Sequence, residues 1–206
     1  MMNKTILKKK FSYYFDLLWP LNRSLTGNDT RKTHKILSQI VKLKTTEVKS
    51  GTRVNDWTIP LEWNVKDAYI TNLKNEKIID FKKNNLHLIG YSVPFKGYIS
   101  KKKLIKKLIF LKNIPNAIPY STSYYKKNWG FCLSYNQLKR LKDKKFFVKV
   151  DTKLSKGSMT ISEIYLPGKI KKEILIHTYT CHPSMAINEL SGPILTALLA
   201  KEIFKS

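Results

Sequence analysis

Cysteine is scarce in this chain of 206 residues, which contains only Cys132 and Cys181. Two cysteines exclude a framework of disulfides and a zinc site with four thiolate ligands. Apolar runs are short as well: none approaches the about 20 residues that a membrane-spanning helix needs. No signal-peptide cleavage site follows the basic N-terminus. We therefore expect a reduced, cytoplasmic chain without a membrane span.

Arginine is also scarce, although the chain carries a formal net charge of +25. Proteins that read nucleic acids favour arginine, because its planar guanidinium binds pairs of oxygen atoms. This chain is rich instead in lysine, isoleucine and asparagine, which share A/T-rich codons. The composition predicts a lysine-coated surface with salt-sensitive, non-specific attraction to polyanions. The four arginines among the 39 basic residues are Arg23, Arg31, Arg53 and Arg140.

Hydrophobic residues make up 42% of the chain, enough for one ordinary domain or one domain with a smaller insert. Apolar residues that recur every three or four positions predict helices at both ends and two short ones between them. Pro20 ends the first helix, and Thr26 or Asn28 is the expected N-cap of the second. The predicted helices cover residues 8–19, about 29–43, about 101–111, 134–141 and 194–204.

Between the helices the apolar pattern alternates, which predicts short strands. Asn72–Asn75 is the expected hairpin turn, and residues 86–93 continue the β character. Residues 173–179 form a nearly continuous apolar run, which is typical of a strand buried on both faces. The fold class is therefore α/β. The other predicted strands cover residues 47–50, 56–59, 68–72, 77–81, 146–150 and 158–166.

The polar loop after residues 173–179 carries the candidate site, since ligands bind beyond the carboxyl ends of strands in open α/β sheets. His182 offers an imidazole and Glu189 a carboxylate, and both suit zinc. Structural interpretations stay open: His182 could bond to the backbone, and Glu189 could favour the positive end of the next helix. Cys181 is interpreted as a small buried apolar group. A catalytic zinc needs about three protein ligands, so His182 and Glu189 alone do not make a complete site.

Several long strings carry a resemblance to a known family. Residues 158–184 (SMTISEIYLPGKIKKEILIHTYTCHPS) resemble the hairpin and central strand of aminopeptidase-like zinc peptidases, in which the strand ends at the first metal histidine. More specifically, the chain resembles bacterial proteins with an aminopeptidase-like domain, often encoded with surface-polysaccharide biosynthesis genes. The other matching segments are residues 18–33, 50–64, 78–93, 117–136 and 181–193.

The resemblance implies a fold and a metal site. The fold would be a partial zinc-aminopeptidase-like mixed sheet with flanking helices and an inserted β-rich α+β subdomain. His182 matches the first zinc histidine, and the bridging aspartate of the peptidases falls at Asn188 or Glu189, of which the carboxylate is preferable. Ser184 replaces the aspartate that orients this histidine in zinc peptidases. The implied divisions are residues 1–46 and 145–206 for the core and 47–144 for the insert.

Family members are longer and continue through a general-base glutamate, further acidic ligands and a last histidine. Beyond Glu189 this chain offers one acid, Glu202, and no histidine. The resemblance therefore implies an N-terminal fragment that cannot complete a dinuclear zinc site alone. Its partner would be the missing C-terminal half or a second copy of the chain.

Three other functions remain open. Ser184 and Asn188 stand where acids are expected, which favours a non-catalytic binding domain. The positive net charge and the aromatic segment Tyr120–Phe131 favour a nucleic-acid-associated module. The small number of arginines and the spread of lysines along the whole chain argue against it. A structural or partner-binding fragment would expose an apolar edge where the rest of a sheet should pack.

Overall fold

The computed structural model describes residues 3–204, which form two compact units. The first unit contains the described residues up to Leu61 and those from Lys156 onward, and the second is Glu62–Ser155. These limits differ from the boundaries implied by the resemblance, because β1 (Lys44–Lys49) pairs with β10 (Ser158–Glu163) and both belong to the first unit. None of the helices in residues 3–204 is long and apolar enough to cross a lipid bilayer.

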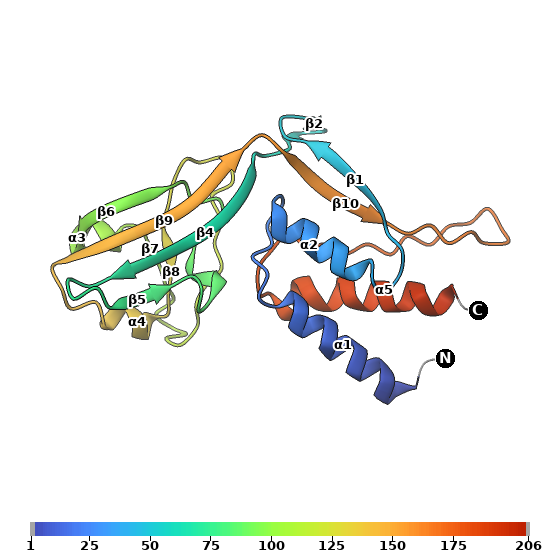
Figure 1. Cartoon of the computed structure of the whole chain (residues 1–206), viewed down its shortest axis with the longest axis horizontal. Helices are drawn as coiled ribbons and strands as arrows, with labels where there is room; N and C mark the ends of the chain where they lie inside the picture. Colours follow the sequence, from blue (N-terminus) through green and yellow to red (C-terminus); the bar gives the residue numbers. More distant parts are fainter. Residues whose placement is uncertain (1–2, 205–206) are drawn as a thin grey trace. The chain divides into compact units, whose positions relative to one another are not determined.

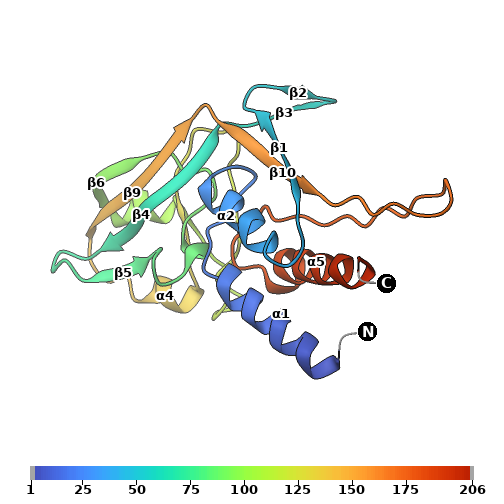
Figure 2. The same cartoon turned by 45° about the vertical axis from the view of Figure 1, so that its right-hand side comes forward.

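Three helices lie side by side in the first unit: α1 (Lys4–Leu18), α2 (Asn28–Leu37) and α5 (Gly192–Ile203) (Figures 1 and 2). The predicted stripe of α1 faces this group, with Leu18 fully buried and Phe11, Tyr14 and Phe15 packed against its core. Burial of these apolar stripes drives the association of the helices. The shared core consists of Leu18, Leu21, Leu37, Ile40, Leu190, Ile194, Ala197 and Leu198.

The N-terminus of α2 differs from the prediction. Its N-cap is Gly27, with φ of 110°, and no side chain caps it. Thr26 instead donates its hydroxyl to the carbonyl of Leu61, and Asn28 is already the first helical residue. A glycine adopts this left-handed backbone without strain, which lets the loop turn sharply into the helix. The helix also ends at Leu37, earlier than the predicted residue 43.

The strands of the first unit form two small antiparallel pairs. β1 and β10 pair along their whole length, from Lys44 opposite Glu163 to Lys49 opposite Ser158. β2 (Arg53–Val54) and β3 (Trp57–Thr58) form a short hairpin. These pairs account for the predicted alternation at residues 47–50, 56–59 and 158–166.

The buried strand predicted at residues 173–179 does not form in the structure. After β10 the backbone runs out and back without regular secondary structure (Figure 1, orange). Ile174 and Leu175 are 91% and 89% exposed. A strand exists only through hydrogen bonds to a neighbour, and no described residue pairs with this segment in a ladder. The prediction was wrong for the chain by itself, although the apolar character it rested on is present.

The second unit is built on a four-stranded antiparallel sheet in the order β5-β4-β9-β6. The central pair is β4 (Glu62–Thr71) and β9 (Lys145–Ser155), flanked by β5 (Lys77–Asp80) and β6 (Phe95–Ser100). Alternate side chains of these strands form its core. The predicted turn Asn72–Asn75 joins β4 to β5. The core residues include Ala68, Ile70, Ile79, Phe146, Val148 and Val150, all at most 2% exposed.

Short elements complete the second unit. The helix predicted at 101–111 ends at Ile105, and Leu108–Ile109 instead pairs as β7 with β8 (Phe131–Cys132). Residues 86–93 contain no strand, since they hold part of η1 (Asn85–His87) and isolated bridges only. The helix predicted at 134–141 is α4 (Tyr135–Lys139), which begins with a capping box between Ser134 and Gln137. The short helix at Lys101–Ile105 is α3.

Candidate metal centre

The candidate site lies in the first unit, where the loop of residues 180–185 enters a helix. A π-helical turn, η2 (Ala186–Ser191), precedes α5 and carries Glu189 on its inner side. Such turns occur often at functional sites, because they displace side chains from regular helical positions. Gly192 fixes the approach of the loop: a Cβ atom there would lie 2.5 Å from Oγ1 of Thr178. Only glycine therefore lets residue 178 lie against the start of α5.

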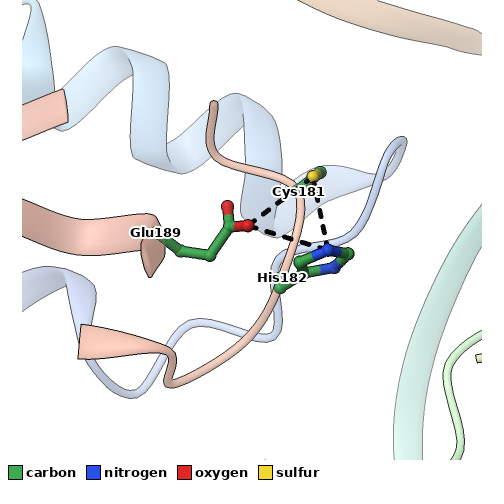
Figure 3. Close-up of side chains that lie close together, drawn as sticks. All are labelled: Cys181, His182 and Glu189. Carbon is green, nitrogen blue, oxygen red and sulfur yellow. Dashed lines mark hydrogen bonds and ion pairs between the residues drawn. The ribbon is translucent and has the colours of Figure 1, made fainter. Parts of the chain in front are cut away.

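Three potential ligand atoms of different chemistry meet at this point (Figure 3). Nε2 of His182 lies 3.7 Å from Oε1 of Glu189, and Sγ of Cys181 lies 3.8 Å from each of them. Zinc bonds of about 2.0–2.3 Å place neighbouring tetrahedral ligands about 3.5 Å apart. The spacing of the three atoms thus fits coordination of one ion, and thiolate, imidazole and carboxylate are all zinc ligands.

Burial controls the protonation of Glu189. Its side chain is fully buried, and this burial raises the pKa of its carboxyl from 4.5 to about 7. The backbone N–H groups of Cys181 and His182 and the charge of Arg23 act in the opposite direction. A buried carboxylate is unfavourable without a compensating positive charge. The site therefore favours binding of a cation.

The other two groups are uncharged in the ion-free chain at neutral pH. Burial lowers the pKa of the His182 imidazole below its ordinary value of 6.5, which favours the neutral form that binds metals. Burial, with the charge of Glu189, raises the pKa of the Cys181 thiol to about 12. Cys181 must lose its proton to act as a ligand, so metal binding at this site releases a proton.

Two of the three sequence-predicted ligands point to the same place. His182 and Glu189 face each other, and Asn188 lies next to Glu189. Nδ2 of Asn188 donates to Oε1 of Glu189 at 3.3 Å, and its Oδ1 accepts from the hydroxyl of Tyr179 at 2.9 Å. Asn188 thus contacts the same carboxylate oxygen that faces His182 and Cys181, and metal binding by any of the three predicted residues remains a prediction.

Sequence reasoning missed two residues of the site. The sequence indicated an apolar role for Cys181, but its sulfur lies in the cluster, and its position next to His182 was the available signal. Arg23, in the loop between α1 and α2, is fully buried, and its charge acts on both Glu189 and Cys181. The only signal for Arg23 was its type, since arginine is rare in this chain.

The loop of the site is fixed to the rest of the first unit by His34 of α2. Its Nδ1 lies 2.7 Å from Oγ of Ser162 on β10, and its Nε2 lies 3.3 Å from Oγ1 of Thr180. His34 is therefore a hydrogen-bonded structural residue, and the residue before Cys181 has a defined position. His177, by contrast, is exposed on the irregular segment.

Comparisons with known proteins show what the chain is similar to. Residues 62–153 match the family described as "Domain of unknown function (DUF2172)", which corresponds to the second unit. A "Putative polysaccharide biosynthesis protein with aminopeptidase-like domain" from Clostridium acetobutylicum is 48% identical over 188 residues, which are 91% of this chain and 43% of the relative. The chain thus spans less than half of the relative's length.

A solved structure is also similar to nearly the whole of this chain. The crystal structure of a "putative peptidase" from Clostridium acetobutylicum has a TM-score of 0.94 and 45% identity to this chain. The likeness covers 98% of this chain and 48% of that one. Both relatives match nearly the whole chain and both are named for a peptidase or an aminopeptidase-like domain. Over nearly its whole length the chain is therefore similar to bacterial proteins named for a peptidase or an aminopeptidase-like domain, of which it spans less than half.

Proposed function

We propose that this chain supplies part of the metal centre of an aminopeptidase-like hydrolase, with Cys181, His182 and Glu189 as zinc ligands. One observation carries the proposal: three ligand atoms lie within 4.8 Å of one another around a fully buried carboxylate. Zinc bound in such a site lowers the pKa of a water molecule and polarises a carbonyl group, which is the chemistry of amide hydrolysis. The relative's name supports an amide substrate in polysaccharide biosynthesis, either a peptide or an amide on a sugar.

The side chains of this chain alone reach the number of protein ligands that a zinc ion needs. His182 offers its neutral ring nitrogen, and Glu189 is ionised above a pH of about 7. Asn188 donates to Oε1 of Glu189 and so helps to hold the carboxylate in place. Three protein ligands are the usual number in catalytic zinc sites.

Cobalt(II), a spectroscopic substitute for zinc, tests the metal site. We expect one Co²⁺ per chain, with a thiolate-to-metal absorption band that Cys181→Ser removes. His182→Ala should weaken binding by at least about 10-fold. His177→Ala is the matched control, because His177 is a nearby exposed histidine outside the cluster. Absence of stoichiometric binding, or equal binding by the H182A and H177A variants, would contradict the proposal.

We further propose that this chain by itself does not hydrolyse peptides. Among residues 3–204 the structure contains one group of potential metal ligands, and no second carboxylate belongs to it. A general base must be within hydrogen-bond reach of the water that it activates, and Glu189 is a proposed ligand. The catalytic base would come from polypeptide that corresponds to the remaining 57% of the relative.

The exposed apolar segment supports a partner of this kind. Ile174 and Leu175 on the irregular segment and Leu195, Leu199 and Ile203 on α5 are all at least 47% exposed. Large exposed apolar patches mark interaction sites, and these five side chains are the apolar surface that we propose the partner covers. The probe is the C-terminal part of the Clostridium acetobutylicum relative, added as a separate polypeptide to the zinc-loaded chain. We expect complex formation and a gain of aminopeptidase activity, and a complex without activity would instead favour the non-catalytic binding domain.

A further inference from the structure

A chain of hydrogen-bonding side chains connects the β1–β10 pair to the loop of the candidate site. Oγ1 of Thr45 on β1 lies 3.0 Å from Oγ of Ser162 on β10, which lies 2.7 Å from Nδ1 of His34 on α2. Nε2 of the same ring lies 3.3 Å from Oγ1 of Thr180. Burial lowers the pKa of the His34 imidazole below its ordinary value of 6.5, against the charge of Glu47. The neutral ring has one donor and one acceptor nitrogen, and the two hydroxyls satisfy both.

The loop needs an anchor of this kind, because the chain that leads into it has no regular structure. Residues 164–179 lie in no helix or strand of the described chain, and Ile174 is 91% exposed. Fixing each backbone residue of such a segment costs about 1–2 kcal/mol of conformational entropy. Cys181 and His182 follow this segment directly, whereas Glu189 belongs to η2. The spacing of the ligand cluster therefore depends on where the loop is held against the helices.

Two threonines hold the chain at this point. Thr178 lies against Gly192 at the start of α5, a contact of shape alone, whereas the hydroxyl of Thr180 contacts His34. A hydrogen bond restricts both distance and angle, so the second contact is the more directional one. Cys181 follows Thr180 in the chain, and its Sγ lies 3.8 Å from Oε1 of Glu189. Metal–ligand distances vary by only about 0.2 Å, so a small displacement of Thr180 is enough to disturb the cluster.

We propose that His34 is a positioning residue for the metal centre: through Thr180 it holds Cys181 and His182 at the distance from Glu189 that one ion requires. This proposal rests on the metal site proposed above. Groups that orient metal ligands contribute about 10- to 100-fold to metal affinity. His34 acts one residue away from the ligands, so we expect the lower end of this range.

Thr180→Val tests the role, because it replaces the hydroxyl by a methyl group of similar size. We expect it to weaken Co²⁺ binding about 10-fold and to change the thiolate-to-cobalt absorption band. Thr180→Ser keeps the hydroxyl and should restore near-native affinity and the native band. Thr46→Val, at an exposed threonine of β1, is the matched control. A T180V variant that binds Co²⁺ as tightly as the T46V variant would overturn the proposal.

A double-substitution cycle shows whether His34 and Thr180 act as one unit. His34→Phe keeps a ring at this position but removes both nitrogen atoms. In the H34F background T180V should have almost no further effect on Co²⁺ affinity, since the hydrogen bond is already lost. Equal losses from T180V in both backgrounds would contradict the pairing. Should H34F not fold, the comparison of T180V with T180S decides the question alone.

Hydrogen exchange supplies a readout that needs no metal. With a chelator present, T180V should speed exchange of the amides of residues 178–182 about 2- to 10-fold and leave the amides of α5 unchanged. A native chain that binds no Co²⁺, with faster loop exchange in T180V, would overturn the metal site and leave the anchor standing. Stoichiometric Co²⁺ binding with no effect of T180V on affinity or exchange would leave the metal site standing and overturn the role of His34.

Discussion

Nε2 of His182 lies 3.7 Å from Oε1 of Glu189, and the two groups come from different elements, a loop and a π-helical turn. Burial disfavours the charged form of both side chains. The imidazole stays neutral, and the carboxyl keeps its proton up to a pH of about 7. This relationship makes the site responsive to pH and to cations.

Glu189 should impose a pH dependence on the stability of the metal-free chain. Its folded pKa of about 7 lies above its ordinary value of 4.5, so the folded state binds this proton more tightly than the unfolded state. The contribution of Glu189 to stability is therefore greatest at low pH and falls as the pH rises from about 4.5 to about 7. Urea unfolding at several pH values, with a chelator, measures this slope. E189Q should lack the Glu189 part of it, and identical slopes in both proteins would contradict the pKa assignment.

Substitution of Gly192 should distort the site. Because the Cβ of an alanine would lie 2.5 Å from Oγ1 of Thr178, Gly192→Ala forces the loop away from α5. We expect a loss of about 1–3 kcal/mol in the free energy of unfolding. Thr178→Ala should restore much of it, since the nearest remaining atom lies 3.5 Å away. Gly168→Ala is the control, because its nearest neighbour lies at 3.9 Å. A G192A variant as stable as the G168A variant would show that the close approach is absent.

Two neighbouring residues of α5 separate the core of the first unit from its surface. Ile194 is fully buried in the helical core, whereas Leu195 is 49% exposed. Ile194→Ala should cost about 2–5 kcal/mol because it opens a cavity. Leu195→Ala should change stability by no more than about 0.5 kcal/mol. Chemical denaturation of both variants measures the difference, and a reversed order would mean that α5 buries a different face.

The exposed apolar segment should make the chain associate. Replacement of Ile174 and Leu175 by glutamine should abolish self-association in sedimentation experiments without a change in Tm, since both side chains are about 90% exposed. Leu73→Gln, at an exposed leucine of the β4–β5 turn, is the control. A variant that associates as strongly as the native chain would show that another surface is responsible.

The helices and turns that the sequence predicted correctly are those that depend on local signals. The apolar stripe before Pro20 indicated α1, and the turn Asn72–Asn75 indicated the β4–β5 hairpin. The apolar run at residues 173–179 predicted a strand, but strand formation needs a paired neighbour, which a local pattern cannot supply. Lys101–Ile105 forms a helix as predicted, whereas Leu108–Ile109 pairs with Phe131–Cys132 across a long loop.

Prediction of the candidate site from the local sequence has the same limit. His182 and Glu189 were predicted from their residue types and the likeness to zinc peptidases, and the structure brings them together. The contribution of Cys181 depends on the path of a single loop, and that of Arg23 depends on the packing of α1 against the rest of the first unit. Neither relationship is encoded in spacing along the sequence, so both could be found only from the fold.

X-ray absorption at the zinc edge tests the central claim most directly, because it reports the ligands of the ion itself. For the chain loaded with one equivalent of zinc, we predict one sulfur at about 2.3 Å and nitrogen or oxygen ligands at about 2.0–2.1 Å. Cys181→Ser should remove the sulfur shell and leave the lighter ligands. A first shell of oxygen atoms alone, the same in the native chain and in the C181S variant, would contradict a metal centre at Cys181, His182 and Glu189.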